Sequence, residues 1–286
     1  MKAFYESRTY NTEVPVSATL IKDLDFVAHW HTDIEVLYVR EGSIGAGINS
    51  EYRILQAGDI SICGSNDIHY YESEGMTSTV ALIIFRPDIL NVFKHWLSNL
   101  QPCSIFIDRD LQTSEKTGRD FSGQIKQIIS SIISEMGQKK ELYPQFTDLH
   151  IFELFLTLFR QLPSYYADSV RDPDDFQTAS DIKPMQKALK YLEEYHTQDI
   201  TLEQISSKVN LSRFYFSRLF RKTTGMNFNT YLNRIRADKA EELIRDTRKP
   251  IIEIAYETGF LSIRTFNRSF KAIKGFTPHS LRQAWI

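Results

Sequence analysis

One short pattern occurs twice near the C-terminus and restricts the possible folds more than any other feature of the chain. The first copy, at 211–221, reads LSRFYFSRLFR, and the second, at 261–271, reads LSIRTFNRSFK. A serine, two phenylalanines and an arginine recur at the same spacing, and a glycine follows each copy, as Gly225 and Gly275. A repeat at a fixed period indicates two copies of one structural unit.

Local signals predict a helix, a short turn and a second helix in each copy. Thr201 opens a capping box before the first pair of helices. Ser212 and Ser262 are suited to N-cap the second helix of each pair, and the glycine after each copy is a typical helix end. The sequence therefore predicts two helix-turn-helix units, at about 202–225 and 251–275, with one extra residue in the second turn.

A long helix is predicted between the two units, from about 228 to 245. At about 1.5 Å per residue, its length is about 27 Å. Successive major-groove faces on one side of B-DNA lie roughly 34 Å apart. One chain could therefore place two recognition helices in adjacent major grooves of one duplex.

The second helix of each unit divides into an apolar face and a face suited to DNA. Arginine pairs with guanine, asparagine pairs with adenine, and an apolar group meets the thymine methyl. The residues predicted to contact bases are Phe214, Ser217, Arg218, Ile263, Arg264, Asn267 and Arg268. The residues predicted to contact phosphates are Arg221, Lys222, Lys271 and Lys274. The alternative is that the two arginines of the repeat form ion pairs inside the domain, with Glu203 or Glu253.

Charge is distributed unevenly along the chain. The net charge is −2 at pH 7, but residues 181–286 hold 19 Lys and Arg against 11 Asp and Glu. The residues before them hold 15 basic and 25 acidic groups. The basic C-terminal part coincides with the repeat, which indicates a domain that binds a polyanion. The acidic part before it indicates a domain that a polyanion would be repelled from.

Composition disfavours several classes of protein. Cys63 and Cys103 are the only cysteines and lie far apart, which excludes a disulfide scaffold and a paired-cysteine zinc site. No charged leader with an apolar run opens the chain, and the longest apolar run, at 80–85, is too short to span a bilayer. We therefore expect a cytoplasmic protein with no membrane partner.

The first hundred residues carry the signals of a β-rich domain. Short runs of β-branched and aromatic residues alternate with turn residues, at 34–39, 51–55, 60–63 and 79–85. Asn49-Ser50 is suited to a hairpin turn, and Glu41-Gly42 is expected to end the first run. Many short strands with such punctuation predict a small sandwich or barrel.

Helical periodicity begins near residue 121. Isoleucines at three- and four-residue spacing predict one helix over 125–133, and a second apolar stripe predicts another over 151–159. Both could pack on the sheet, but the second has more large apolar residues than one contact needs, which suggests the seam of a homodimer. An aperiodic linker is expected at 166–183, and Pro184 is placed at the start of the next helix.

Four polar residues of the β-rich part could form a site. His29, His31 and Glu35 would share one face of a continuous strand. His69 follows at a distance suited to a neighbouring strand. Such groups can hold a divalent metal. They can also line a polar pocket in which an aromatic side chain stacks on a sugar, or be satisfied polar groups at a barrel mouth. We assign no metal and no cofactor. The residues assigned to a ligand pocket are His29, Trp30, His31, Glu35, Tyr38 and His69.

The last hundred residues resemble the AraC/XylS family of bacterial transcription regulators. The resemblance rests on both copies of the repeat, on Arg236, on Gly259-Phe260 and on the GFTP run at 275–278. It implies two helix-turn-helix units on one linker helix, bound to adjacent major grooves of double-stranded promoter DNA. It also implies that the predicted base-contacting residues face the bases. One departure is Ser206, where alanine is common, and it changes local packing.

The N-terminal part is similar to the cupin-type sensor domain that is often joined to this module. The run HWHTDIE at 29–35, Gly42, Gly58-Asp59 and His69 carry the similarity. It implies a small-molecule effector, often a sugar, a homodimer formed through helices after the barrel, and contact with RNA polymerase. The expected function is a ligand-responsive activator of a catabolic operon, not an enzyme. The alternative is a metal-dependent cupin enzyme held on DNA by its C-terminal domain.

The expected architecture is multidomain. A cupin-like all-β barrel (a double-stranded β-helix) with two trailing helices occupies 1–165, and the linker occupies 166–183. An all-α DNA-binding domain of two helix-turn-helix units occupies 184–286.

Overall fold

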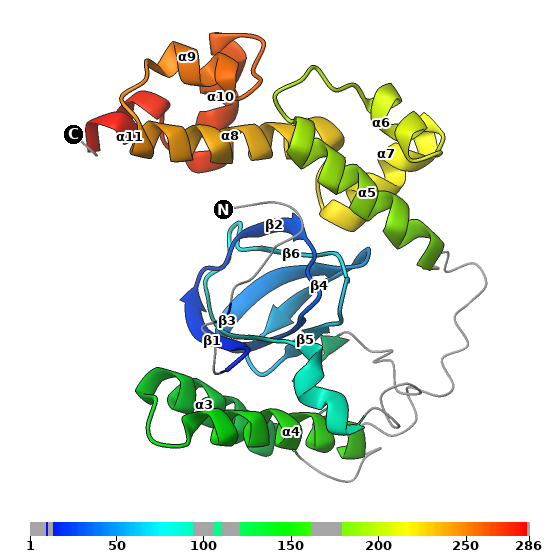
Figure 1. Cartoon of the computed structure of the whole chain (residues 1–286), viewed down its shortest axis with the longest axis vertical. Helices are drawn as coiled ribbons and strands as arrows, with labels where there is room; N and C mark the ends of the chain where they lie inside the picture. Colours follow the sequence, from blue (N-terminus) through cyan, green and yellow to red (C-terminus); the bar gives the residue numbers. More distant parts are fainter. Residues whose placement is uncertain are drawn as a thin grey trace. The chain divides into compact units, whose positions relative to one another are not determined.

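The chain divides into two compact units. Trp30–Phe176 forms most of a β-rich unit, and Gln177–Ile286 forms most of a helical unit (Figure 1). A β-rich N-terminal part followed by a helical C-terminal part confirms the expected fold class, while the finer assignment to a cupin barrel stays a prediction. The computed structural model describes residues 10, 14–93, 106–109, 112, 121–161 and 179–284.

Strand β3 joins two layers of antiparallel strands in the β-rich unit. The strands are β1 Val16–Lys22, β2 Phe26–His29, β3 Ile34–Ile48, β4 Glu51–Gln56, β5 Ile60–Cys63, β6 His69–Glu72, β7 Ser78–Phe85 and β8 Phe106–Ile107. The first half of β3 lies between β5 and β7, and its second half lies between β4 and β6. β1 pairs with β7, β8 pairs with β5, and β2 pairs with β6.

The expected end of a strand at Glu41-Gly42 is wrong, because β3 continues to Ile48. A bulge between Val39 and Glu41 bends the strand at this point. Gly42 has a φ of +72°, and a Cβ on it would lie 1.9 Å from the carbonyl oxygen of Thr77. Glycine here therefore lets the strand bend and continue, instead of ending it.

The hairpin predicted at Asn49-Ser50 is confirmed. Both residues have positive φ angles, 48° and 88°, and they connect β3 to β4 where Ile48 pairs with Glu51. Positive φ at both central positions is the geometry that two-residue hairpin turns require. β4, β5 and β7 also lie where the short apolar runs predicted strands.

The helical unit begins earlier than expected. α5 starts at Ala179, so Pro184 lies inside this helix rather than at its start. Residues 166–178 of the predicted linker lie outside the described residues. In the described part of the chain, no helix combines the length and apolarity that a bilayer-crossing segment needs. The helices are η1 Pro87–Phe93 (3-10), α3 Ser122–Gln138, α4 Tyr143–Gln161, α5 Ala179–Tyr195, α6 Leu202–Lys208, α7 Arg213–Thr224, α8 Phe228–Asp246, α9 Ile251–Glu257, α10 Ile263–Lys274 and α11 Pro278–Ala284.

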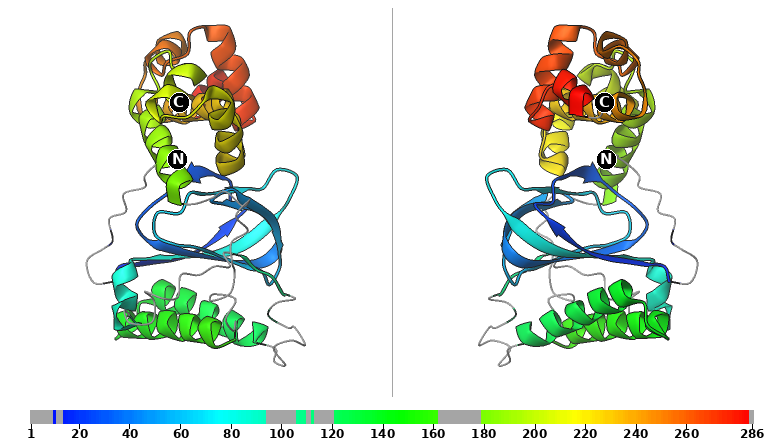
Figure 2. Two further views of the ribbon diagram at one scale, coloured as in Figure 1. Left: turned by 90° about the vertical axis from the view of Figure 1, so that its right-hand side faces the viewer. Right: turned by 90° about the vertical axis from the view of Figure 1, so that its left-hand side faces the viewer.

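Two apolar clusters lie on opposite faces of β3. Val36 and Tyr38 belong to the cluster that α3 and α4 cover, and Leu37 and Val39 belong to a separate cluster with side chains of β4, β6 and β7. The period of two along a strand produces this division. Figure 2 shows α3 and α4 side by side against one layer of strands. Both predicted helices therefore pack on the sheet.

Candidate nucleic-acid interface and buried polar site

The first helix-turn-helix unit consists of α6, a short turn and α7. The Thr201 hydroxyl accepts a hydrogen bond from the Gln204 backbone N–H, and the Gln204 side chain accepts one from the Thr201 N–H. These contacts confirm the predicted capping box. Ser212 Oγ accepts the backbone N–H of Tyr215 at the start of α7, and Gly225 ends α7 with a φ of +73°.

The second unit repeats this plan with α9 and α10. Ser262 Oγ accepts a backbone N–H three residues along, and Gly275 ends α10 with a φ of +80°. The second turn holds one residue more than the first, as predicted. Phe260 of this turn is buried, with its ring edge-on to Phe266 at 5.1 Å between centroids, whereas Leu261 is 72% exposed.

Phenylalanine side chains hold the second helix of each unit against its neighbours. Phe220 of α7 lies edge-on to Tyr231 of α8, with 5.3 Å between ring centroids. Phe270 of α10 belongs to one apolar cluster with Ala240 and Ile244 of α8. The phenylalanines predicted to form the core are fully buried: Phe216, Phe220, Phe266 and Phe270. The predicted apolar faces are therefore confirmed.

Arg236 of α8 ties the second turn to the loop after α5. Its guanidinium donates to the carbonyl oxygens of His196 and Gln198, each at 2.8 Å. Gly259 packs against the same loop with a φ of +90°, and a Cβ on it would lie 2.6 Å from the His196 oxygen. Only glycine fits this position. In the sequence, Arg236 was identified only by the family resemblance. Helical periodicity does not reveal a hydrogen bond between a helix and a distant loop.

The outward faces of α7 and α10 carry the residues predicted to contact bases. Six of the seven are exposed, and Ile263 is half-buried. Phe214 is 78% exposed, which leaves its ring available to a thymine methyl group. Arg218 lies over the ring of Tyr215, 5.6 Å from its centroid. Glu203, considered as an internal partner for an arginine of the repeat, lies 3.9 Å from Arg213 instead.

Lys274 differs from the other predicted phosphate contacts. Its side chain is 13% exposed, and its ammonium group pairs with Asp238 and Glu241 of α8. The paired charge is not available to a phosphate, so we reassign Lys274 to holding α10 on α8. The three remaining basic residues are exposed and keep their predicted role as a proposal: Arg221, Lys222 and Lys271.

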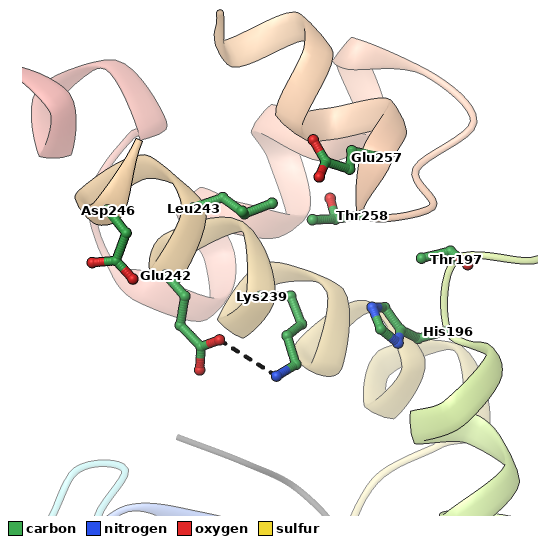
Figure 3. Close-up of a pocket in the computed structure, with 8 residues that line it drawn as sticks. All are labelled: His196, Thr197, Lys239, Glu242, Leu243, Asp246, Glu257 and Thr258. Carbon is green, nitrogen blue, oxygen red and sulfur yellow. Dashed lines mark hydrogen bonds and ion pairs between the residues drawn. The ribbon is translucent and has the colours of Figure 1, made fainter. Parts of the chain in front are cut away.

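A groove of about 380 Å³ lies between the loop after α5, the second half of α8 and the end of α9 (Figure 3). Its polar walls include Glu242, Asp246 and Glu257. Lys239 donates a hydrogen bond to Glu242 at 3.4 Å. Because carboxylates predominate, this groove is unsuited to a phosphate backbone.

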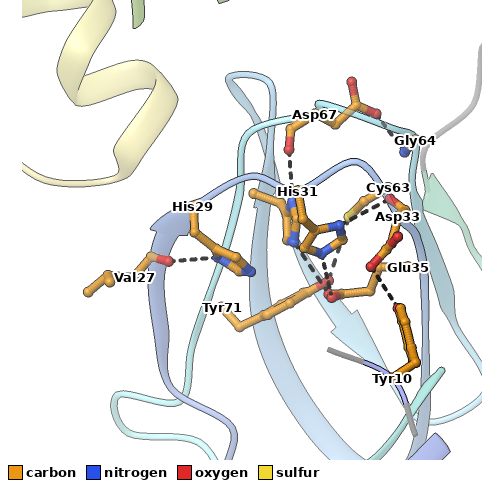
Figure 4. A network of polar contacts seen from close by, with 11 residues as sticks. Tyr10, Val27, His29, His31, Asp33, Glu35, Cys63, Gly64, Asp67 and Tyr71 are labelled. Atoms are coloured by element: carbon orange, nitrogen blue, oxygen red, sulfur yellow. Dashed lines mark hydrogen bonds and ion pairs between the residues drawn. The ribbon is translucent and has the colours of Figure 1, made fainter. Parts of the chain in front are cut away.

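Four buried polar side chains converge in the β-rich unit (Figure 4). His29 ends β2, His31 follows it, Glu35 lies in β3 and His69 begins β6. Their ligand-type atoms all lie within 4.8 Å of one another, and no side chain of the four is more than 3% exposed. The expectation of one continuous strand is wrong, because the chain turns between β2 and β3. The residues meet because three separate segments bring them together.

Glu35 is the shared partner within this cluster. Tyr71 donates its O–H to Glu35 Oε1 at 2.7 Å, His31 Nε2 lies 3.3 Å from Oε2, and His69 Nε2 lies 3.6 Å from Oε1. Burial alone would raise the pKa of Glu35, but the charge of His69 and the hydrogen bonds of both histidines hold that pKa well below its usual value. Glu35 is therefore a carboxylate.

The structure changes the membership of the predicted ligand pocket. Tyr38 belongs to the apolar cluster under α3 and α4, on the opposite face of β3 from Glu35, so it does not line a site with the histidines. Trp30 is buried but is not one of the four converging side chains. Cys63 and Tyr71 were missed, although their Sγ and hydroxyl oxygen lie 3.7 Å apart beside Glu35. The sequence signal for Tyr71 is its position two residues after His69 on one strand.

Two family models match the chain. The model of a helix-turn-helix domain matches residues 205–284, and the model of the AraC-like ligand binding domain matches residues 21–155. The ligand-binding model matches the N-terminal part of the chain and the helix-turn-helix model matches the C-terminal part.

Two curated relatives and one solved structure are also similar to this chain. The regulatory protein PocR of Salmonella typhimurium is 38% identical over 99 residues, which cover 35% of this chain and only 33% of PocR. The HTH-type transcriptional activator RhaS of Klebsiella pneumoniae is 22% identical over 258 residues, which cover 90% of this chain and 88% of RhaS. The structure of the C-terminal domain of AraT, a response regulator from Geobacillus stearothermophilus, is 33% identical with a TM-score of 0.34 and covers 35% of this chain and 84% of that chain.

The matched models and the relatives point to one family. Both models correspond to domains of transcription regulators, and RhaS aligns with this chain across nearly its whole length. The helical unit contains the two capped helix-turn-helix units on which the resemblance was based. The chain belongs to the AraC/XylS family and is a DNA-binding transcription regulator, with an N-terminal ligand-binding domain and a C-terminal helix-turn-helix domain.

Proposed function

We propose that this regulator is an effector-responsive activator that binds promoter DNA as a homodimer and places α7 and α10 of each chain in successive major grooves. The observation that supports the proposal most directly is the pair of matched helices, each capped by serine and ended by glycine. The 19 residues of α8 lie between them. At about 1.5 Å per residue α8 is about 28 Å long, close to the roughly 34 Å between successive groove faces.

The two recognition helices supply different contacts to the bases. α10 presents Arg264, Asn267 and Arg268, which can each donate to a base edge, and half-buried Ile263 beside them. The corresponding face of α7 consists of Phe214, Ser217 and Arg218. The exposed residues Arg221, Lys222 and Lys271 are proposed to contact phosphates and to set the register of each helix.

The outer face of α4 supports a homodimer. Three large apolar side chains are exposed there, with exposed fractions of 44%, 55% and 40% for Phe146, Leu149 and Leu156. Leu142, which is 58% exposed, lies in the turn just before the helix. The spacing of three and seven residues places the three helical side chains along one face of α4. A second copy of the same face would cover them through a two-fold interface.

This dimer makes a prediction for sedimentation of the full chain. The double variant Leu149→Gln, Leu156→Gln removes two central apolar contacts, so we expect it to sediment as a monomer at concentrations where the unchanged protein is a dimer. Lys126→Gln, a change at an exposed residue of α3 away from these three side chains, serves as the matched control. If the double variant is still a dimer, like the control, the proposed α4 interface is contradicted.

The acidic groove in Figure 3 is proposed to contact RNA polymerase. RhaS is named as an activator, and an activator needs a surface that DNA does not occupy. Asp246 supplies the carboxylate proposed to meet a basic partner surface, because Glu242 and Glu257 already pair with Lys239 and Lys249. We expect Asp246→Asn to lower transcription in vitro while operator affinity is unchanged. A parallel loss of operator affinity would contradict this assignment.

The effector is proposed to be a small polar metabolite, with sugars as the class that the family resemblance suggests. Regulation of a catabolic operon and action on chromosomal DNA in the cytoplasm follow from the same proposal. The alternative, a metal-dependent enzyme held on DNA, takes its support from the buried cluster of three histidines and Glu35. Turnover of a candidate substrate by the purified protein would favour the alternative.

Selection from a pool of random DNA duplexes tests the proposed function. We expect the full chain to enrich sites in which two clusters of preferred bases lie about one helical turn, roughly 10 base pairs, apart. Enrichment of a single cluster of bases would show that only one of the two helices, α7 or α10, contacts bases. No enrichment at low salt would contradict sequence-specific binding.

A further inference from the structure

The two arginines of the repeat, Arg218 of α7 and Arg268 of α10, occupy equivalent positions but have different surroundings. In the part of the chain that the structure describes, neither is paired with a carboxylate, and only Arg218 lies over an aromatic ring. We propose that Tyr215 is a positioning residue that holds the guanidinium of Arg218 ready to contact a base. This inference rests on the proposed function, because it requires Arg218 to contact a base.

The ring of Tyr215 is fixed next to Arg218 by the helix itself. The two residues are three positions apart on α7, so their side chains are neighbours on its surface. The guanidinium carbon of Arg218 lies 5.6 Å from the centre of the Tyr215 ring, within the range of a cation–π contact. Tyr215 is half-buried, and its backbone N–H donates to the Ser212 hydroxyl that caps the helix. The ring is therefore held by the protein, while Arg218 beside it is exposed.

A cation–π contact prepares an arginine for a base without occupying it. The contact uses the charge of the guanidinium and leaves its N–H groups free to donate hydrogen bonds. Guanine presents O6 and N7 in the major groove, and arginine can donate to both as a bidentate pair. An arginine whose conformations are already restricted loses less entropy when it forms that pair. The Tyr215 ring therefore increases both operator affinity and the preference for guanine at the base pair that Arg218 contacts.

The second unit has no ring at the equivalent position. The repeat aligns Thr265 of α10 with Tyr215 of α7. The Thr265 hydroxyl accepts a hydrogen bond from the Ser262 hydroxyl at 3.0 Å, so this short side chain is directed to the helix cap. Arg268 instead lines an open groove together with a second cation, Lys271. α7 therefore presents an arginine that is positioned before DNA binds, and the arginine of α10 is ordered only by DNA.

The test uses the full chain and an operator duplex selected from random DNA, titrated at one fixed salt concentration. Tyr215→Leu keeps the apolar bulk of the side chain but removes the ring face. We expect it to lower operator affinity by about two- to fivefold, the strength of a cation–π contact at an exposed site, and to lower the preference for guanine by the same factor. Tyr215→Phe keeps the ring and should bind like the unchanged protein.

A double variant separates positioning from a direct contact between Tyr215 and DNA. In the Arg218→Ala background, Tyr215→Leu should cause no further loss of affinity or of base preference. Tyr215→Leu alone should leave the slope of log affinity against log salt unchanged, because no phosphate contact is lost. Thr265→Val, at the matching position of α10, is the control and should leave the base preference of both helices unaltered.

Circular dichroism checks that each variant is folded, and Tyr215→Met replaces Tyr215→Leu if the latter is not. The proposal is overturned if the ring-removing variant binds like the unchanged protein, if Tyr215→Phe loses as much affinity, or if the losses from Tyr215→Leu and Arg218→Ala add. If Arg218→Ala leaves base preference unchanged, the proposed role of Arg218 fails and the inference fails with it. If Arg218→Ala relaxes base preference and Tyr215→Leu does not, the inference alone is contradicted.

Discussion

The two helix-turn-helix units share caps and core but differ in their turns and outward faces. In the first turn Asn210 has a φ of +58°, whereas in the second Gly259 has a φ of +90° and packs against the loop after α5. α7 presents an exposed phenylalanine, and α10 presents two arginines and an asparagine. The common parts fix where each helix lies, and the differing parts decide what it contacts. We therefore expect α7 and α10 to offer different chemistry to DNA.

The largest expected effect tests the shared core. Phe216→Ala and Phe266→Ala each remove a fully buried ring at equivalent positions, so we expect each to lower the free energy of unfolding of the helical unit by about 3–5 kcal/mol. Urea unfolding followed by circular dichroism measures both. Phe214→Ala, at a residue that is 78% exposed, should change stability by less than about 0.5 kcal/mol. If the two changes lower the free energy of unfolding by clearly different amounts, the two phenylalanines do not have equivalent roles in the two units.

A pair of glycines tests how the second turn is held in place. Gly259 and Gly275 both have positive φ, but only at Gly259 does an added Cβ meet backbone, 2.6 Å from the His196 oxygen. We expect Gly259→Ala to cost about 3 kcal/mol and Gly275→Ala about 1 kcal/mol, because strain is common to both and the clash is not. Thermal unfolding of both variants measures the difference. Equal costs would show that the second turn is not braced as described.

The two arginines of the repeat test the outward faces. We expect Arg218→Ala and Arg268→Ala each to weaken operator binding by about 1–3 kcal/mol and to relax base preference at positions about one helical turn apart. Binding to single-base operator variants provides the measurement. If either change weakens specific and random DNA alike, that arginine contacts phosphate and not a base.

The smallest effect separates two lysines of α10. Lys271 is exposed, whereas Lys274 is paired with Asp238 and Glu241. Each phosphate contact contributes about −0.9 to the slope of log affinity against log salt. Lys271→Ala should therefore reduce the magnitude of that slope by about one contact, while Lys274→Ala should leave it unchanged and lower stability instead. If Lys274→Ala reduces the slope as much as Lys271→Ala does, Lys274 contacts a phosphate after all.

Local signals in the sequence were sufficient for the helices and core of the two helix-turn-helix units. The N-caps Ser212 and Ser262 and the glycines at the helix ends act within four residues of their partners, so they can be read without knowledge of the fold. The phenylalanine faces follow from helical periodicity alone. Lys274 could not be placed in this way, because its carboxylate partners lie more than thirty residues away on α8.

The β-rich unit depends on contacts that are distant in the sequence. Gly42 looks like the end of a strand until Thr77 is known to pack against it. Tyr38 looks like a neighbour of Glu35, but their different parity on β3 places them on opposite faces. The convergence of His29 with His69 depends on the pairing of β2 with β6, which no local pattern reveals.

Hydroxyl-radical footprinting of the full chain on a selected operator tests the central claim most directly. With both recognition helices engaged, each chain should protect two stretches of backbone on one face of the duplex, centred about 10 base pairs apart. Arg218→Ala should weaken protection of one stretch and Arg268→Ala protection of the other. A single protected stretch per chain, or one stretch weakened by both variants, would contradict the account.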